Sequence, residues 1–280
     1  PDDPQPLTNE QLVSLIDLPP YQDYKVLPER TVKIKQHQDN IEFAAMVESM
    51  DESLGRIVDH IDQLGLTDNT LIVFFSDNGG MSGANFGGAS RVVDSSRLDS
   101  AYSTSNLPLR GAKGWLYEGG IRVPMIVKWP EKFSDSSRIV EEPVISTDFY
   151  PSLLEMAGLP ADDEQALDGV SFVPALNGDS FNRGPIFWHF PQYSNHGMQS
   201  PGGAVRFGDY KLLEYFENNT VQLFNLREDI GERNDLSQTE PQIREELRTL
   251  LRSWREDVDA QMPPRNPDYD PSQYPHRASP

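Results

Sequence analysis

The longest regular pattern of apolar residues lies between residues 39 and 64. Apolar side chains recur there at spacings of three and four residues, the period of one face of an α-helix. Gly65 follows them and favours a helix end, because glycine readily adopts the conformation of a C-terminal cap. The pattern predicts a helix with a stripe that faces a hydrophobic core. Its members are Ile41, Ala44, Val47, Met50, Leu54, Ile57, Ile61 and Leu64.

A different pattern follows at residues 71–75, which are apolar without alternation and rich in β-branched and aromatic side chains. This composition is typical of a strand buried on both faces. The run ends in Ser-Asp-Asn-Gly-Gly at residues 76–80. Ligands of α/β sheets gather at the carboxyl ends of parallel strands, so Asp77 and Asn78 lie where such a sheet carries its chemistry.

Later segments predict further elements. Residues 121–129 predict a second strand, with Pro124 at its start or at a sheet edge. Residues 144–158 predict a helix that ends at Gly158. The residues expected to face inward from this helix are Ile145, Phe149, Leu153, Leu154 and Met156.

The last hundred residues favour short strands separated by polar turns, which indicates an antiparallel sheet. The predicted strands cover residues 185–190, 203–207, 210–216 and 221–226, and an amphipathic helix over 243–258 follows them. By contrast, residues 1–37 are proline-rich and predict an irregular entry segment with a short helix at 9–16.

The predicted fold class is therefore α/β, with helices about a mixed sheet, followed by a smaller α+β part that holds the antiparallel sheet. We place the boundary near residue 180, which gives domains of residues 1–180 and 181–280. The loop at 79–108 is long and polar, and it has two interpretations: a substrate-facing loop or a solvent-exposed insertion.

Composition narrows the classes of partner. The 280 residues include 44 acidic and 24 basic side chains, a net charge of −20, so nucleic acid is a poor candidate partner. No run approaches the roughly 18 consecutive apolar residues that a membrane span needs, so we expect no membrane anchor. There is no cysteine, which excludes disulfides, thiolate metal sites and a cysteine nucleophile within this chain.

Two short motifs carry candidate chemistry. Asp77 and Asn78 offer hard oxygen ligands suited to calcium or magnesium, although Asp-Asn-Gly-Gly is also ordinary turn chemistry. In Arg-Gly-Ala-Lys at residues 110–113, glycine leaves Lys113 free to point at an anion. The alternative for Lys113 is a solvated loop lysine. For Glu118 and Arg122 we favour a role in fixing the loop over contact with substrate.

Together these motifs resemble those of the sulfatases, in the alkaline-phosphatase-like superfamily. The resemblance rests on Ser-Asp-Asn-Gly-Gly at 76–80 and on residues 109–124, which run from Leu-Arg-Gly-Ala-Lys to Glu-Gly-Gly-Ile-Arg-Val-Pro. It extends to the helix before the first motif, to residues 148–158 and to Gly-Asp-Tyr-Lys-Leu at 208–212. Leu-Phe-Asn-Leu at 223–226 and Gly231-Glu232 add to it, so that it covers most of residues 39–255.

The resemblance implies roles for three residues. Asp77 and Asn78 would be calcium ligands, with magnesium the less favoured ion, and Lys113 would be catalytic by binding the sulfate oxygens. It also implies a sulfated small molecule or glycan as substrate. A periplasmic, secreted or lysosomal location is implied in the same way.

The nucleophile is where this sequence departs from the family, which uses a formylglycine made from cysteine or serine in a C-x-P-S-R type of motif. The chain has no cysteine and no serine followed two places later by proline. Asp2 and Asp3 lack the strand that precedes the family's N-terminal calcium ligands. We therefore expect a C-terminal portion of a sulfatase that is inactive alone, with formylglycine and further ligands in an N-terminal half that acts as its partner.

Further candidate substrate-binding residues are Arg110, His189, His196 and Arg206. The two histidines lie in a segment rich in aromatic and polar groups that suits a sugar or aryl group, and Arg206 suits an anionic substituent. The alternative is that Trp188 and Phe190 pack the small sheet and that the histidines are incidental.

Three hypotheses for function remain open at this point. The favoured one is hydrolysis of sulfate esters. The second is a phosphodiester or phosphonate hydrolase of the same superfamily, although Asp-Asn in place of Asp-His favours a sulfatase. The third is a non-catalytic binding or scaffold module.

Overall fold

The computed structural model describes residues 21–27, 30–83, 102–133, 138–160, 164–193, 199–217, 219–264 and 267–268, with the backbone alone for the part of 21–33 that it includes. The predicted helix at 9–16 lies outside the described residues. None of the described helices combines the length and apolar character that crossing a bilayer requires.

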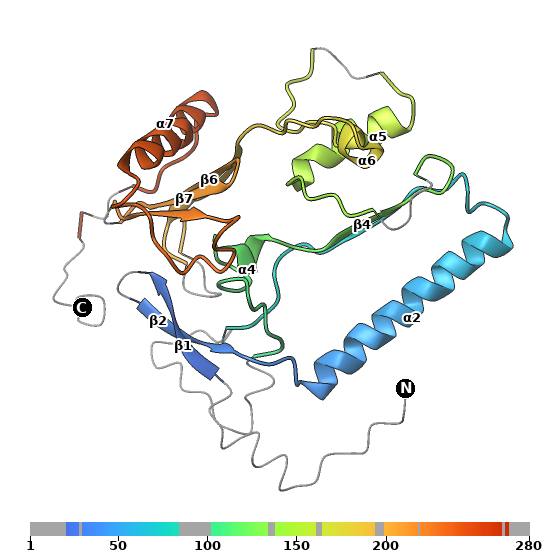
Figure 1. Cartoon of the computed structure of the whole chain (residues 1–280), viewed down its shortest axis with the longest axis horizontal. Coiled ribbons are helices and arrows are strands. Elements are labelled where there is room, and N and C mark those ends of the chain that lie inside the picture. The colour runs from blue at the N-terminus through green and yellow to red at the C-terminus, as the bar shows by residue number, and fades with distance from the viewer. Residues whose placement is uncertain are drawn as a thin grey trace, which may run out of the picture.

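The structure is a mixed α/β fold whose sheets are antiparallel (Figure 1). Its first part contains β1 (Tyr21–Leu27), β2 (Arg30–Lys35), α2 (Ile41–Gln63), β3 (Ile72–Phe75), α4 (Glu118–Ile121) and β4 (Met125–Lys128). A middle part contains the 3-10 helix η2 (Ser146–Asp148), α5 (Phe149–Met156) and α6 (Val173–Asn177). The last part contains β5 (Ile186–Phe190), β6 (Gly202–Phe207), β7 (Tyr210–Tyr215), β8 (Val221–Asn225) and α7 (Pro241–Asp257).

The C-terminal sheet confirms the sequence prediction: four antiparallel strands lie in the order β5-β6-β7-β8. Alternate residues of a strand point to opposite faces, so each face has its own set of side chains. On one face, Val205, Leu212 and Leu223 pack against α7, where Leu247 and Leu251 are buried. Pro241 begins α7, since proline is tolerated in the first turn of a helix.

The opposite face of this sheet packs against the loop that precedes α4. Trp115, Leu116 and Tyr117 join a buried cluster with Leu213 and Phe224 of the sheet. Ile34 of β2 belongs to the same cluster. This core draws on both sides of residue 180, and the division into domains at that residue stays a prediction.

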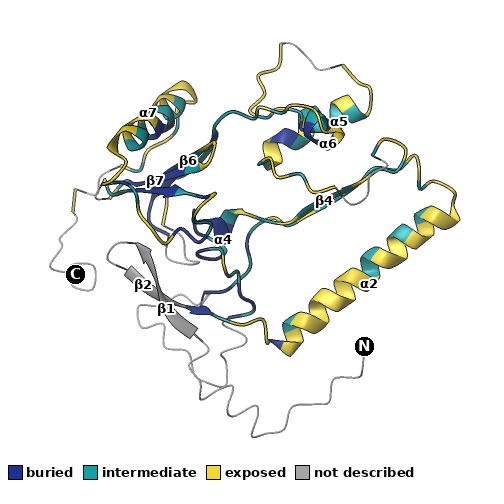
Figure 2. Cartoon of the chain, viewed as in Figure 1, coloured by how far each residue is buried: buried dark blue, intermediate teal, exposed yellow. Residues whose placement is uncertain are grey.

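The helix α2 confirms the predicted helix but not its buried stripe. Asn40 caps its start by accepting a hydrogen bond from the Phe43 N–H at 2.9 Å. No residue of α2 is buried, and Met50 is 52% exposed. Figures 1 and 2 show why: α2 lies along one side of the molecule, and no described element covers its outer face.

The predicted strand at 71–75 is also more exposed than expected. β3 pairs with β4 in an antiparallel ladder, and Phe75 and Ile126 are 47% and 61% exposed. The parallel neighbour expected beside β3 is therefore absent from the described residues. Pro124 does immediately precede β4, as predicted.

Three local predictions were wrong. Residues 21–35 contain the antiparallel pair β1 and β2, where the sequence predicted irregular chain. Residues 118–121 form one helical turn before the strand that was expected to begin at 121. Leu153 of α5 is 45% exposed, while the residue buried from that helix is Ser152.

Leu251→Ala tests the packing of α7. We expect the free energy of unfolding to fall by about 2–5 kcal/mol, because the change leaves a cavity in a closed core. Met50→Ala is the matched control from the uncovered stripe of α2, with an expected change within about 0.5 kcal/mol. Denaturant unfolding of both variants measures the difference, and equal losses would contradict the packing described here.

Candidate functional site

The polar turn after β3 carries the first predicted pair of site residues. Asp77 is exposed, and Asn78 is partly buried. The Asn78 side-chain N–H donates to the Gly79 carbonyl at 3.1 Å, which leaves the amide oxygen Oδ1 for other partners. In the described part of the chain, no hydrogen bond reaches Oδ1 of Asn78 or the carboxylate of Asp77.

The structure brings Lys113 to this turn through the backbone. The Lys113 N–H donates to the Gly80 carbonyl at 3.2 Å, and the Gly79 N–H donates to the Gly120 carbonyl at 3.0 Å. The side chain of Lys113 is half-buried and makes no hydrogen bond or ion pair with the described residues. Two motifs that are separated in the sequence are thus adjacent in space.

Glycine makes this approach sterically possible. A Cβ atom on Gly79 would lie 1.8 Å from the carbonyl oxygen of Gly119. A Cβ atom on Gly119 would in turn lie 2.5 Å from the carbonyl oxygens of Arg110 and Gly111. Because each obstacle is backbone, no side-chain rotation relieves it.

Asn106 holds the same two segments together from the side. Its Nδ2 lies within hydrogen-bond distance of the carbonyl oxygens of Gly80, Gly111 and Gly119, at 2.8, 3.2 and 3.0 Å. One amide group thereby satisfies carbonyls of both motifs. The sequence pattern alone did not predict this role of Asn106.

A cavity of about 290 Å³ opens beside Asn78. Gly79, Gly80, Asn106 and Arg122 are among the residues that line it. The guanidinium of Arg122 also lies 3.9 Å from the Glu118 carboxylate, and the backbone N–H of Arg122 donates to the Glu118 carbonyl at 2.7 Å. These contacts confirm that Glu118 and Arg122 fix the loop.

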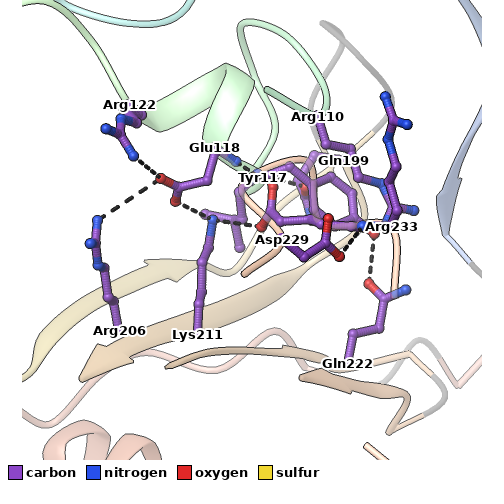
Figure 3. A network of polar contacts seen from close by, with 12 residues as sticks. Arg110, Tyr117, Glu118, Arg122, Gln199, Arg206, Lys211, Gln222, Asp229 and Arg233 are labelled. Carbon is purple, nitrogen blue, oxygen red and sulfur yellow. Dashed lines mark hydrogen bonds and ion pairs between the residues drawn. The ribbon is translucent and has the colours of Figure 1, made fainter. Parts of the chain in front are cut away.

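Behind the loop, a buried charge cluster ties α4 to the C-terminal sheet (Figure 3). Lys211 Nζ lies 2.9 Å from Oε1 of Glu118 and 2.9 Å from Oε1 of Glu232. Glu232 accepts the Glu118 backbone N–H through Oε2 at 2.7 Å. The side chains of Lys211, Glu118 and Glu232 are 0, 2 and 0% exposed.

The two carboxyl groups of this cluster are shifted in opposite directions. Burial disfavours the ionised form of Glu118, but Lys211 and Arg206 outweigh it and hold the pKa of Glu118 below its usual range. Burial raises the pKa of Glu232 to about 7, since the attraction of Lys211 is insufficient and the charge of Glu118 adds to the shift. Because Lys211 lies between both carboxyl groups, Glu118 stays ionised and Glu232 is the group that takes up a proton as the pH falls.

Two predicted substrate-binding arginines have partners within the chain. Arg110 is buried, stacks over the Tyr117 ring at 4.0 Å and donates to the Glu232 carbonyl at 2.6 Å. Arg206 points to the Glu118 carboxylate, 3.9 Å away. Both arginines therefore stabilise the region around α4, and contact of either with a substrate stays a prediction.

His189 lies on β5 and is not among the residues that line the cavity beside Asn78. Its Nε2 is 2.8 Å from the Gln261 carbonyl oxygen, and its ring is 5.6 Å from that of Phe216. Trp188 packs against the buried cluster of the sheet, as the alternative interpretation expected. His196 lies outside the described residues.

Comparison with known proteins decides the family. The Sulfatase family model matches residues 6–159, more than half of the chain. A second model, N-sulphoglucosamine sulphohydrolase, C-terminal, matches residues 112–257. This chain belongs to the sulfatase family.

Relatives of known sequence or structure agree. A sulfatase of Formosa agariphila is 33% identical over 235 residues, and the steryl-sulfatase of Mus musculus is 35% identical over 134 residues. The crystal structure of Ps i-CgsB in complex with k-i-k-neocarrahexaose is 28% identical, with a TM-score of 0.62. The neighbouring folds are alkaline-phosphatase-like, which confirms the predicted fold class.

This sulfatase chain is much shorter than its relatives. The match to the Formosa protein covers 76% of the chain, the match to the mouse enzyme 48%, and the match to the Ps i-CgsB structure 91%. They cover only 39, 20 and 48% of the Formosa protein, the mouse enzyme and the Ps i-CgsB chain.

The residues at the turn of the sulfatase chain fit part of a calcium site. The Asp77 carboxylate and Asn78 Oδ1 are hard oxygen donors without a competing hydrogen bond from the described residues. Calcium takes about 6–8 oxygen ligands. Within the described ranges, no three His, Asp or Glu side chains gather as a metal site, so this pair is at most a portion of a full set.

The sequence contains signals for two further features of the site. Lys211 stands in an apolar strand at a position that faces the core, in register with Arg206 of β6. Two cations at such positions indicate a buried anion. Asn106 offered a weaker signal, because a single asparagine in a polar loop has many ordinary roles.

Gly79→Ala tests the close contact of the two motifs. We expect a loss of more than about 4 kcal/mol in the free energy of unfolding, because the new methyl group meets backbone. Gly55→Ala is the control: no atom lies within 4 Å of its Cβ position, and alanine in a helix interior is favoured by roughly 0.5–1 kcal/mol. Thermal and denaturant unfolding compare them, and a well-folded Gly79→Ala variant would contradict the geometry.

Glu232→Gln tests the buried charge cluster through the pH dependence of stability. The pKa of Glu232 is raised from its ordinary 4.5 to about 7, so its contribution to stability is full below 4.5 and is lost as the pH rises to 7. The pKa of Glu118 is lowered, so its contribution is lost only at more acidic pH. Between pH 4.5 and 7 the variant should gain on the order of 3 kcal/mol relative to wild type. Unfolding titrations measure this gain, and a difference that is constant with pH would refute the assignment.

Proposed function

We propose that this chain is the C-terminal portion of an enzyme that hydrolyses sulfate esters. The observation that carries the proposal is the hydrogen bond from the Lys113 N–H to the Gly80 carbonyl. It places a lysine beside a turn whose oxygen atoms suit a divalent cation. Membership of the sulfatase family supports the same reaction.

Lys113 is the residue assigned to the sulfate group. The protein carries a net charge of −20, so an anionic substrate requires a local cation. Arg110 and Arg206 are engaged within the chain, whereas the Lys113 ammonium has no partner among the described residues. A fixed ammonium beside the ester stabilises the charge that develops on its oxygen atoms during transfer.

Asp77 and Asn78 are assigned to calcium, through the carboxylate and Oδ1 respectively. When bound, the ion supplies positive charge beside the transferred group. The chain's own contribution is to hold these oxygen atoms in place: Ser76 Oγ donates to the Asn78 carbonyl at 2.9 Å, and Asn106 restrains Gly80.

The nucleophile is assigned to an N-terminal part of the same protein, as a formylglycine. The sequence contains no cysteine, and the relatives are more than twice as long as the matched segment. The uncovered stripe of α2 and the half-exposed pair β3 and β4 give this part apolar surface to pack against. It would also complete the calcium ligands.

The substrate is a sulfated small molecule or glycan. The relatives support both classes: one is named a steryl-sulfatase, and the Ps i-CgsB structure is a complex with a neocarrahexaose. The half-buried β5 with His189, and the loop that begins at Gly79, are where specificity is expected.

Lys113→Ala in the longer protein tests this proposal. We expect kcat/KM for an aryl sulfate to fall by about 10²–10³-fold, the usual effect of removing one group that stabilises developing charge. The exposed Lys128→Ala is the matched control, with unchanged activity.

Other outcomes of this experiment distinguish the remaining hypotheses. Faster hydrolysis of an aryl phosphate than of the aryl sulfate would favour a phosphodiester or phosphonate hydrolase. No turnover by the longer protein, or tolerance of Lys113→Ala, would favour a non-catalytic module. The isolated 280 residues should be inactive, and turnover by them alone would contradict an external nucleophile.

A further inference from the structure

The buried charge cluster of Glu118, Lys211 and Glu232 has no part in the function proposed above. Burying an ion is costly, and apolar side chains of similar volume often serve stability as well or better. Here three ionisable groups are buried, and one ammonium lies between two carboxyl groups. Stability alone is therefore a weak account of the cluster.

The groups that face Glu232 define its balance of charge. Lys211 comes from β7 and Glu118 from α4, while Arg110 binds the Glu232 carbonyl. Tyr117 and Tyr215 also face it; burial raises the pKa of Tyr117 to about 12 and holds that of Tyr215 well above its usual range, so both stay neutral. Arg206 and Arg122 lie on the side of Glu118.

A short path of hydrogen bonds connects Glu232 to the loop that carries Lys113. Glu232 Oε2 accepts the Glu118 N–H at 2.7 Å, and the next residue, Gly119, donates its N–H to the Arg110 carbonyl at 2.6 Å. Gly120 accepts the N–H of Gly79. The helical turn α4 therefore contacts both Arg110, at the start of the loop that carries Lys113, and the turn after β3.

We propose that Glu118, Lys211 and Glu232 are positioning residues, which hold residues 109–121 against the C-terminal sheet and so place Lys113 for the sulfate ester. The inference rests on the role of Lys113 in the proposed function. The contact depends on the charge of Glu232, because among the described residues Lys211 is its only ion-pair partner and Glu118 shares that ammonium.

The protonation state of Glu232 should determine how firmly residues 109–121 are held against the sheet. With Glu232 protonated, Lys211 and Glu118 form an ion pair, and Oε2 of Glu232 still accepts the Glu118 N–H. With Glu232 ionised, two buried carboxylates share Lys211 and repel each other. The loop should therefore be held less firmly as the pH rises through neutrality, and Lys113 should lose its position.

Glu232→Gln in the longer protein tests this through the pH profile of sulfate-ester hydrolysis. Glutamine keeps the size of a neutral carboxyl group and an oxygen to accept the Glu118 N–H. A group that titrates near pH 7 is about one-tenth protonated at pH 8, so wild-type kcat/KM should fall about tenfold more than that of the variant between pH 6 and 8. Equal falls in the two proteins would overturn the proposal.

Hydrogen exchange of residues 109–121 provides a readout that does not require activity. Protection of this segment should fall about tenfold from pH 6 to 8 in wild type and stay constant in Glu232→Gln, after correction for intrinsic exchange. If the longer protein shows this change but hydrolyses no sulfate ester, the proposed function fails and the charge-dependent hold stands. If the enzyme is active but the protection of residues 109–121 does not change between pH 6 and 8, the proposed positioning role is overturned.

Glu214→Gln is the matched structural control. Glu214 is a buried carboxylate on the same strand as Lys211, but it pairs with Arg248, Arg252 and Arg255 of α7 on the opposite face. Its loss should reduce stability without changing the pH profile, and an altered profile would overturn the assignment to the cluster. If Glu232→Gln does not fold, Glu118→Gln replaces it: Glu232 then has Lys211 to itself, and the fall between pH 6 and 8 should disappear.

Discussion

The contact between glycine backbones at residues 79 and 119–120 is the constraint on which the site depends. It brings the turn after β3 within hydrogen-bond distance of α4, and no side chain fits between them. The backbone segments that carry Asp77, Asn78 and Lys113 are therefore adjacent. The scaffold supplies this proximity through backbone, which has far fewer conformations than long side chains would have.

The buried charge cluster supports this contact between the glycine backbones. The loop before α4 lies on one face of the C-terminal sheet, and α7 covers the other. Glu118 is the polar anchor on the first face, where Lys211 and Arg206 present two cations from neighbouring strands. The C-terminal sheet thus supports the loop at 109–121 that carries Lys113, and this packing and charge pairing explain why one core spans both parts of the chain.

Apolar surface that the described residues leave uncovered supports the proposed N-terminal part. The stripe of α2 has the periodicity of a packed helix, yet none of its members is buried and most are exposed. β3 is half-exposed despite its composition. An apolar stripe that the described residues leave exposed gives the proposed N-terminal part a surface to pack against. The shorter length relative to the sulfatase relatives agrees with this interpretation.

The sequence by itself determined the local elements and the chemistry of the motifs. The periodicity of α2 and α7, the turns of the C-terminal sheet, and the residue types of Asp77, Asn78 and Lys113 are local properties, so a linear pattern contains them. The tertiary structure decided what long-range contact controls: the antiparallel partner of β3, the exposure of α2, and the inward direction of Arg110 and Arg206. It also decided the role of Lys211, because a lysine becomes a buried counter-ion only when the chain places carboxylates from distant positions around it.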